Sequence, residues 1–196
     1  LGLEGWNIGS KYAKADILLI SDDDSYPKRN VLSKAVEIMS KRKSVGIIAP
    51  KIVNPDNKVQ WPRFFKGERE VAGFTGSSWF IRKDLWNQIG MYPKDYFMFY
   101  NELSIIPKVL NKKYKIIYFP ELVFVHQSPP TIRLNNQRIY LFTRNHIWNS
   151  LRFDPFFLLP ITLSYGLIEH LIKTVKMKIS IKYFLLGSYH GFKIIF

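Results

Sequence analysis

The chain has 196 residues, of which 47% are hydrophobic and 16% aromatic, so it can bury one sizeable core and is not a disordered protein. It contains no cysteine, which excludes disulfides and thiolate metal sites. Its net charge of +14 favours an anionic partner such as nucleic acid, lipid headgroups or a phosphorylated substrate.

The first quarter of the chain alternates between helix and strand patterns. Apolar spacing predicts a short helix over residues 6–15, and four consecutive aliphatic residues predict a strand over 17–20 that is covered on both faces. A helix over residues 28–42 and a second strand over 45–49 follow. This order indicates a βαβ unit with parallel strands.

Further short elements follow an aromatic-rich stretch. The patterns predict a strand over residues 76–81, a helix over 83–89 that ends at Gly90, and a helix over 103–110 that Pro107 limits or kinks. Two short strands are then expected, separated by Pro120. They cover residues 114–119 and 122–125.

The character of the chain changes after residue 150. Residues 156–172 are strongly apolar, and residues 183–196 are apolar again. Between these two stretches, lysines alternate with apolar residues, namely Lys173, Lys176, Lys178 and Lys182. Apolar helix faces with lysine edges are typical of helices that lie in a membrane interface. The alternative is a helical subdomain packed on the core.

Three consecutive carboxylates, Asp22, Asp23 and Asp24, follow the first predicted strand. Adjacent carboxylates repel one another unless a cation or hydrogen-bond donors lie among them. In open α/β sheets, ligands bind at the carboxyl ends of strands, where these residues are expected. The sequence therefore predicts a site for a divalent cation, Mg²⁺ or Mn²⁺, that also holds a diphosphate. A solvated turn that ends at Pro27 is the alternative.

Several motifs resemble those of family 2 glycosyltransferases of the GT-A fold. Asn7-Ile8-Gly9 and the strand that ends in Asp22-Asp23-Asp24 resemble the middle of that fold, where an Asp-x-Asp-type motif holds the metal and the nucleotide-sugar diphosphate. Residues 76–83 resemble the Gly-x-x-x-x-x-Arg stretch under the acceptor site. The resemblance implies a mixed, Rossmann-like α/β sheet with flanking helices. It also implies a donor and acceptor pocket, formed by Asn7, Gly76, Ser77, Ser78, Asn101 and Arg144.

The aromatic run at residues 96–100 is followed by Asn101-Glu102-Leu103-Ser104, which resembles the catalytic Glu-Asp-x-Asp segment of the family. In that register Glu102 stands for the general base, while Asn101 and Ser104 replace two carboxylates. A helix N-terminal carboxylate is the alternative role of Glu102. His126 stands at the family's late histidine and is a candidate metal ligand, although a lone histidine after an apolar strand is more often structural.

The tail resembles rhamnosyltransferase-type members through Arg144-Asn145 and Gly187-x-x-x-Gly191. Family members begin with a strand and helix that bind the nucleotide base, and this sequence starts after them. We therefore expect an incomplete glycosyltransferase domain over residues 1–150, inactive alone as a fragment, and a helical, apolar and basic region over residues 151–196. An unpaired sheet edge is expected where the first strands are absent.

The sequence thus predicts an inverting glycosyltransferase that moves a hexosyl or deoxyhexosyl group from a nucleotide-sugar donor to a hydroxyl acceptor. The acceptor is expected to be a glycan or a lipid-linked glycan in surface polysaccharide, lipid-glycan or protein-glycan assembly. We expect a cytoplasmic enzyme, peripheral at the cytoplasmic face of the membrane. A non-catalytic binding module on the same fold is the alternative. Nucleic acid is not an expected partner, because the lysines alternate with aliphatic residues rather than with exposed aromatic ones.

Overall fold

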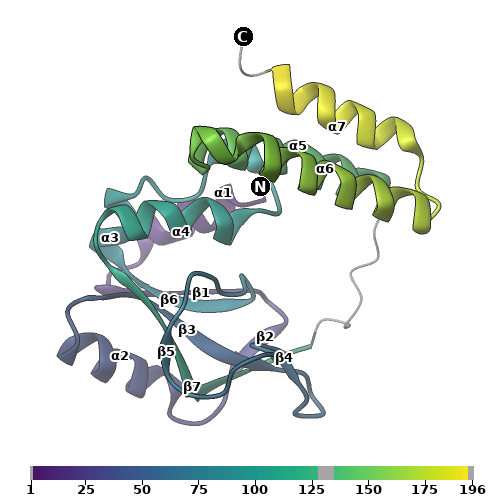
Figure 1. The fold of residues 1–196 in the computed structure, drawn as a ribbon. Coiled ribbons are helices and arrows are strands. Elements are labelled where there is room, and N and C mark those ends of the chain that lie inside the picture. Colours follow the sequence, from purple (N-terminus) through teal and green to yellow (C-terminus); the bar gives the residue numbers. More distant parts are fainter. Residues whose placement is uncertain (1, 128–134, 194–196) are drawn as a thin grey trace.

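The computed structural model describes residues 2–127 and 135–193 of the chain. Its centre is a mixed β-sheet in the order β1-β6-β3-β7-β2, with β4 paired to β3 and β5 paired to β7 (Figure 1). Among the described strands, only β3 and β7 are parallel neighbours. The strands are β1 (Ile17–Ser21), β2 (Ser25–Pro27), β3 (Val45–Val53), β4 (Val59–Trp61), β5 (Arg69–Glu70), β6 (Ser78–Arg82) and β7 (Lys115–His126). The predicted α/β class with a mixed sheet is confirmed.

The predicted βαβ unit is only partly correct. Strands β1 and β3 run in the same direction, but β6 lies between them and is antiparallel to both. Strand β6, which follows β3 in the sequence, is therefore inserted between β1 and β3. No local sequence pattern reveals this insertion. The two strands expected on either side of Pro120 are one strand, β7, whose pairing with β3 shifts register at Pro50 and Lys51.

Strand β1 lies at one end of this strand order. Leu18 and Ile20 are buried, whereas Leu19 is 36% exposed, so the prediction that residues 17–20 are covered on both faces is wrong. Within the described residues β1 pairs with β6 alone, and its other edge carries no strand. The aliphatic run of residues 17–20 therefore forms an edge strand of the sheet rather than a parallel strand that is buried on both faces.

Each face of the sheet is covered by helices, which gives two hydrophobic cores. On one face α2 (Val31–Lys41) packs through Val31, Ala35 and Met39, which recur every fourth residue and so lie along one side of the helix. The other face is covered by α1 (Glu4–Tyr12), α3 (Lys83–Gln88) and α4 (Asn101–Asn111) (Figure 1). Helix α4 runs through Pro107, so that residue does not limit it as predicted.

Three further helices form an outer layer beyond α4 (Figure 1). They are α5 (Asn136–Phe153), α6 (Leu159–Lys176) and α7 (Ile181–Lys193), and short 3-10 turns lie at η1 (Lys94–Tyr96) and η2 (Phe156–Leu158). The predicted division between residues 150 and 151 lies inside α5, which contacts α4 on one side and α6 and α7 on others. The division into two regions stays a prediction.

Candidate active site

The acidic turn joins β1 to β2 and is tied to two other strand ends. The backbone N–H of Asp22 donates to the carbonyl of Ser77 at 2.9 Å, beside the start of β6. The carbonyl of Asp24 accepts from the N–H of Gln127, just after β7, at 2.9 Å. The turn is therefore held where β1 and β7 end and β6 begins, and its carboxylates lie at the carboxyl end of β1, as the sequence predicts.

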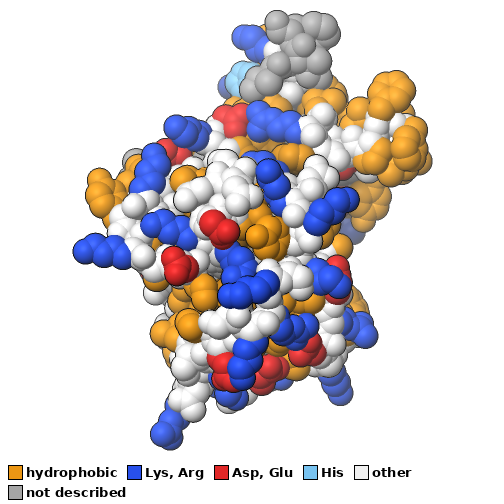
Figure 2. Space-filling view, turned by 90° about the vertical axis from the view of Figure 1, so that its left-hand side faces the viewer, with side chains coloured by type: hydrophobic (Ala, Val, Ile, Leu, Met, Phe, Trp, Pro, Cys, Tyr) orange, Lys and Arg blue, Asp and Glu red, His pale blue; other side chains and the backbone are white. Residues whose placement is uncertain are grey.

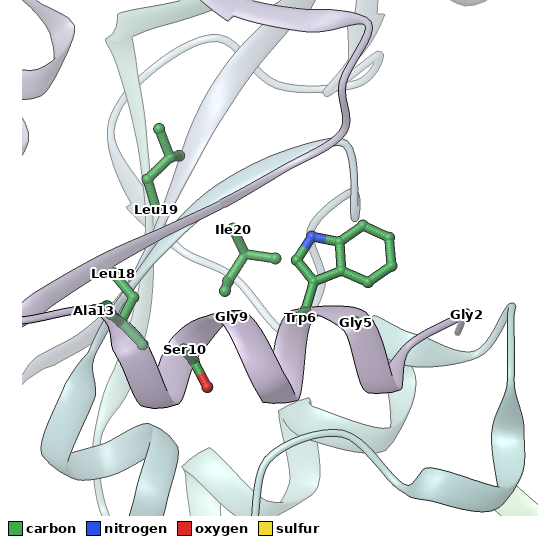
Figure 3. A pocket seen from close by; sticks show the side chains of 9 residues that line it. All are labelled: Gly2, Gly5, Trp6, Gly9, Ser10, Ala13, Leu18, Leu19 and Ile20. Atoms are coloured by element: carbon green, nitrogen blue, oxygen red, sulfur yellow. The ribbon is translucent and has the colours of Figure 1, made fainter.

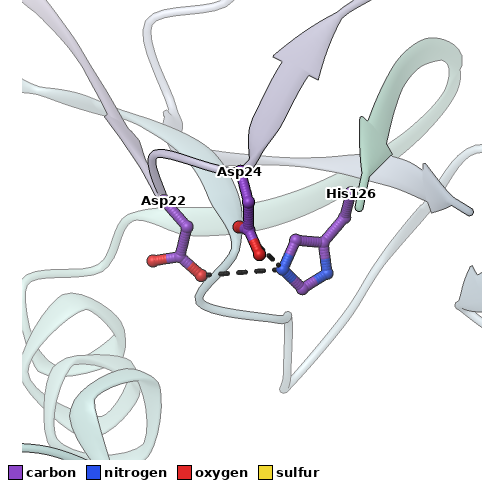
Figure 4. A group of neighbouring side chains, drawn as sticks. All are labelled: Asp22, Asp24 and His126. Carbon is purple, nitrogen blue, oxygen red and sulfur yellow. Dashed lines mark ion pairs between the residues drawn. The ribbon is translucent and has the colours of Figure 1, made fainter. Parts of the chain in front are cut away.

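The carboxylates of Asp22 and Asp24 in this turn face the ring of His126, which is the last residue of β7 (Figure 4). The Nε2 atom of His126 lies 3.2 Å from an oxygen of Asp24 and 3.9 Å from an oxygen of Asp22. One ligand atom from each residue lies within 4.8 Å of the others. Carboxylate oxygens and an imidazole nitrogen form a donor set that can hold a divalent cation such as Mn²⁺. Asp23 is exposed and lies outside this group.

The orientation of His126 is set by Gln60 on β4. The Nδ1 atom of His126 lies 3.0 Å from Oε1 of Gln60, and the Gln60 amide lies 3.3 Å from the His126 carbonyl. If Nδ1–H donates to Gln60, the lone pair of Nε2 faces the two carboxylates. Acceptors that face one another are stabilised by a proton or a metal ion between them, and a second-shell hydrogen bond of this kind is common at metal-binding histidines.

The electrostatics of Asp22 agree with a cation site. The pKa of Asp22 is raised to about 6, mainly by burial; His126 lowers it, and the carboxylates of Asp24, Glu102 and Asp23 add to the rise. A bound cation would reverse this effect, because it favours the ionised form. The clustering of carboxylates is therefore unfavourable alone and suited to a cation.

Glu102 lies in the first turn of α4 and interacts electrostatically with Asp22. Burial raises the pKa of Glu102, and hydrogen bonds to its carboxylate from the backbone at Glu102 and Gly76 oppose that rise. Gly76 lies so close that a Cβ atom there would collide with Oε1 of Glu102 and approach within 2.7 Å of the Asn101 amide. A side chain at position 76 would therefore displace the side chains of Glu102 and Asn101. The structure brings Gly76, Asn101 and Glu102 together, as the sequence predicts.

The predicted pocket residues Ser77 and Ser78 support the turn. The Ser78 hydroxyl lies 2.9 Å from that of Ser21 and 2.7 Å from that of Ser25, so it links β1, β2 and β6. The Ser77 hydroxyl is buried and has no hydrogen-bond partner within the described residues. Buried hydroxyls without a partner are uncommon in folded proteins.

Asn7 and Arg144 have structural contacts instead. Asn7 is buried, and its amide group bonds both the N–H and the carbonyl of Tyr92 at 3.0 Å. Arg144 donates to the carbonyls of Asp95 and Tyr96 and stacks on Trp148 with its guanidinium 4.2 Å from the ring centre. Their predicted place in a donor or acceptor pocket stays a prediction that these contacts do not support.

The segment that leads into Glu102 is strained and is held by α5. Phe97, Phe99 and Tyr100 have positive φ angles of 62°, 68° and 59°, which side-chain-bearing residues adopt rarely. The buried amide of Asn145 lies 3.0 Å from the Tyr96 carbonyl, 2.7 Å from that of Met98 and 3.2 Å from that of Phe99. Sequence reasoning missed this role of Asn145, and it missed Gln60, which lies in the short strand β4 just after a polar loop.

A hollow of about 440 Å³ lies along the open edge of β1 (Figure 3). It is lined by Trp6 and small residues of α1 on one side and by apolar residues of β1 on the other. The open edge is the feature that the sequence predicted. The groove is apolar and does not include the acidic turn.

Neither a protein-family profile nor a curated protein sequence matches the chain. Solved structures do. A mannosyltransferase from Pyrobaculum calidifontis, in complex with GDP-Man and Mn²⁺, is 14% identical with a TM-score of 0.54, and the match covers 99% of this chain and 67% of that one. The chain has a glycosyltransferase fold. GalNAc-T7 with UDP, GalNAc and Mn²⁺ is 16% identical, with a TM-score of 0.53 and coverage of 94% and 42%. S. aureus TarS is 13% identical, with a TM-score of 0.57 and coverage of 89% and 30%.

Proposed function

We propose that the protein transfers a glycosyl group from a nucleotide-sugar donor to a hydroxyl acceptor, with inversion. The observation that carries this proposal is the convergence of Asp22, Asp24 and His126 at the end of β1, beside Glu102, in a glycosyltransferase fold. Two similar structures hold a nucleotide or nucleotide sugar together with Mn²⁺, which supports a diphosphate and metal site here. The chain spans only part of the length of those proteins, so the activity of a whole enzyme is part of the proposal.

Asp22, Asp24 and His126 would hold Mg²⁺ or Mn²⁺, with Gln60 fixing the ring of His126. When bound, such an ion neutralises the charge of the diphosphate leaving group. The Ser77 hydroxyl, which has no partner within the described residues, would donate to a diphosphate oxygen. Asp23 is exposed at the centre of the turn and supports the local negative charge rather than coordinating.

Glu102 would accept the proton of the attacking hydroxyl. A general base works best with a pKa near the working pH, and burial raises the pKa of Glu102 in that direction. Gly76 allows the carboxylate to sit against the backbone, and Asn145 holds the strained segment that precedes it. A single base acting on the acceptor is the arrangement that direct displacement with inversion needs.

The donor would carry a hexosyl or deoxyhexosyl group. The likeness of the tail to rhamnosyltransferase-type members rests on residues that have packing roles here. Gly187 and Gly191 lie against the Tyr140 carbonyl and Ile147 of α5, where a Cβ atom would collide. These contacts explain the two glycines by helix packing, so rhamnose rests on the resemblance alone. A glycan or lipid-linked acceptor at the cytoplasmic face of a membrane suits the basic tail.

A non-catalytic binding module remains a second proposal. Ser104 is fully buried, and its hydroxyl donates to the Asn101 carbonyl at 2.7 Å inside α4. Ser104 therefore stabilises the first turns of α4 and cannot act as the carboxylate that it replaces. A module of this kind would bind donor and metal without transfer.

The test compares wild type with Glu102→Gln and with Glu121→Gln, an exposed glutamate of β7, on a panel of UDP-, GDP- and dTDP-sugars with Mn²⁺. We expect Glu102→Gln to bind donors normally but to release nucleoside diphosphate at least about 100-fold more slowly, while Glu121→Gln behaves as wild type. Donor binding without turnover in the wild type would favour the binding module. Turnover that Glu102→Gln leaves intact would contradict the proposed base.

A further inference from the structure

Helix α6 carries an apolar face that no described element covers. Six exposed side chains, the first in η2 and the other five in α6, follow one another at spacings of three or four residues and so lie along one side of this continuous helical segment. We call them the α6 stripe, and each is between 46% and 75% exposed. They are Phe157, Ile161, Tyr165, Ile168, Ile172 and Val175. Phe156, beside the start of the stripe, is 87% exposed.

The opposite side of α6 is already packed. Gly166, His170 and Thr174 are buried, and a Cβ atom at Gly166 would collide with the ring of His146 on α5. The covered side of α6 therefore consists of small and polar residues, whereas its large apolar side chains lie on the exposed side. An exposed surface of several neighbouring large apolar residues marks a contact site.

Lysines border the stripe toward its C-terminal end. Residues 171–193 contain five lysines and no carboxylate, which gives this segment a charge of +5. Helix α7 continues the pattern with its own exposed apolar positions, including Ile181, Leu185 and Tyr189. Basic side chains also outnumber acidic ones over the face of the molecule that Figure 2 shows. The partner of this region must therefore offer an apolar layer beside negative charge.

We propose that the α6 stripe docks on the surface of a lipid bilayer that contains anionic headgroups, with α6 lying in the interface. Large apolar side chains would enter the boundary between headgroups and acyl chains, and Tyr165 would place its ring and hydroxyl at headgroup depth. Lys176, Lys178 and Lys182 would extend to the phosphates. This proposal rests on the geometry and charge of α6 and α7 and does not depend on the proposed glycosyl transfer.

A second copy of the chain fits this surface less well. Two such faces brought together would set segments of charge +5 beside each other, and like charges across an interface are unfavourable. A bilayer with anionic lipid has the opposite charge.

A spanning role for α6 also disagrees with the contacts. The segment Phe156–Lys176 is long and apolar enough to cross a membrane by length and composition, and 11% of its most apolar window is buried. Crossing, however, would pull Gly166 and His170 off α5 and place the Glu169–Lys173 ion pair (2.5 Å) within the bilayer.

The experiment is flotation of the full chain with phosphatidylcholine vesicles. One set of vesicles also contains about 30 mol% of the anionic lipid phosphatidylglycerol, and the other set contains none. We expect binding to the anionic vesicles that weakens at high salt. Phe157→Ser/Ile161→Ser should lower partitioning at least about tenfold. Lys176→Gln/Lys178→Gln/Lys182→Gln should lower it by roughly 100-fold, since each lysine contributes a factor of about five.

Matched controls change exposed residues elsewhere. Phe64→Ser removes a side chain that is 96% exposed, and Lys34→Gln/Lys43→Gln/Lys113→Gln removes three exposed lysines. Binding equal to wild type in these controls supports the proposal. Four results would overturn it: no binding to anionic vesicles, equal losses in stripe and control variants, a dimer in solution that Phe157→Ser/Ile161→Ser abolishes, or resistance of the bound protein to extraction by alkaline carbonate. The last result would show spanning instead of docking.

Discussion

The Nε2 atom of His126 lies 3.2 Å from a carboxylate oxygen of Asp24, although 102 positions of sequence (126 − 24) separate the two residues. The contact exists because β2 pairs with β7, with Ser25 opposite His126. The sheet register therefore assembles the candidate metal site, and the side chains that fix this register and the ring of His126 become testable.

Gln60 is expected to set metal affinity through His126. Gln60→Leu removes the acceptor for Nδ1–H, so the ring can rotate or change tautomer, and Mn²⁺ affinity should fall by about 10- to 100-fold. Gln60→Glu keeps an acceptor and should retain affinity. Calorimetric titration with Mn²⁺ measures both variants. Equal affinities in Gln60→Leu and wild type would show that His126 needs no such support or is not a ligand.

Gly76→Ala is expected to displace Glu102 without disturbing the metal group. The added methyl group collides with the Glu102 carboxylate, whereas Gly73→Ala, three residues earlier, meets no atom within 4 Å. Transfer should fall at least about tenfold in Gly76→Ala, with Mn²⁺ affinity unchanged, and Gly73→Ala should resemble wild type. Rates and affinities measured side by side check this. Full transfer activity in Gly76→Ala would contradict the role of Glu102.

Asn145→Ala is expected to destabilise the fold by about 2–4 kcal/mol, because it leaves the carbonyls of the strained segment 96–99 without their donor. Asn136→Ala changes an exposed asparagine of the same helix and should cost much less. Urea denaturation gives both free energies of unfolding. A loss below about 0.5 kcal/mol in Asn145→Ala would show that α5 does not hold this segment.

His170 is expected to make the fold less stable in mild acid. Burial lowers its pKa from 6.5 to about 4, so between these values the unfolded chain binds a proton that the folded chain does not. Stability that is complete above pH 6.5 is therefore lost as the pH falls toward 4, with about 2 kcal/mol lost between pH 7 and pH 5. The loss between these two pH values should shrink in His170→Leu. An unchanged loss in urea denaturation would show that other groups cause it.

The sequence predicted the parts of the site that local pattern encodes. An aliphatic run that ends in carboxylates placed Asp22 and Asp24 at a strand end. Glu102 was singled out by the resemblance of residues 96–104 to the catalytic segment of a known family, and its role stays a prediction. The insertion of β6 between β1 and β3 could not be predicted, because it depends on pairing between distant segments. Gln60 and Asn145 were missed for the same reason: their partners lie 66 and 46–49 residues away and leave no periodic signal.

The most direct test of the central claim is calorimetric binding of UDP and GDP to the chain, with and without Mn²⁺, in wild type, Asp22→Asn/Asp24→Asn and Asp23→Asn. The Asp23 variant changes the charge of the same turn outside the ligand group. We expect Mn²⁺-dependent binding in wild type and Asp23→Asn that is lost in the double variant. Nucleotide binding that does not depend on Mn²⁺, or that is retained in Asp22→Asn/Asp24→Asn, would contradict the metal and diphosphate site.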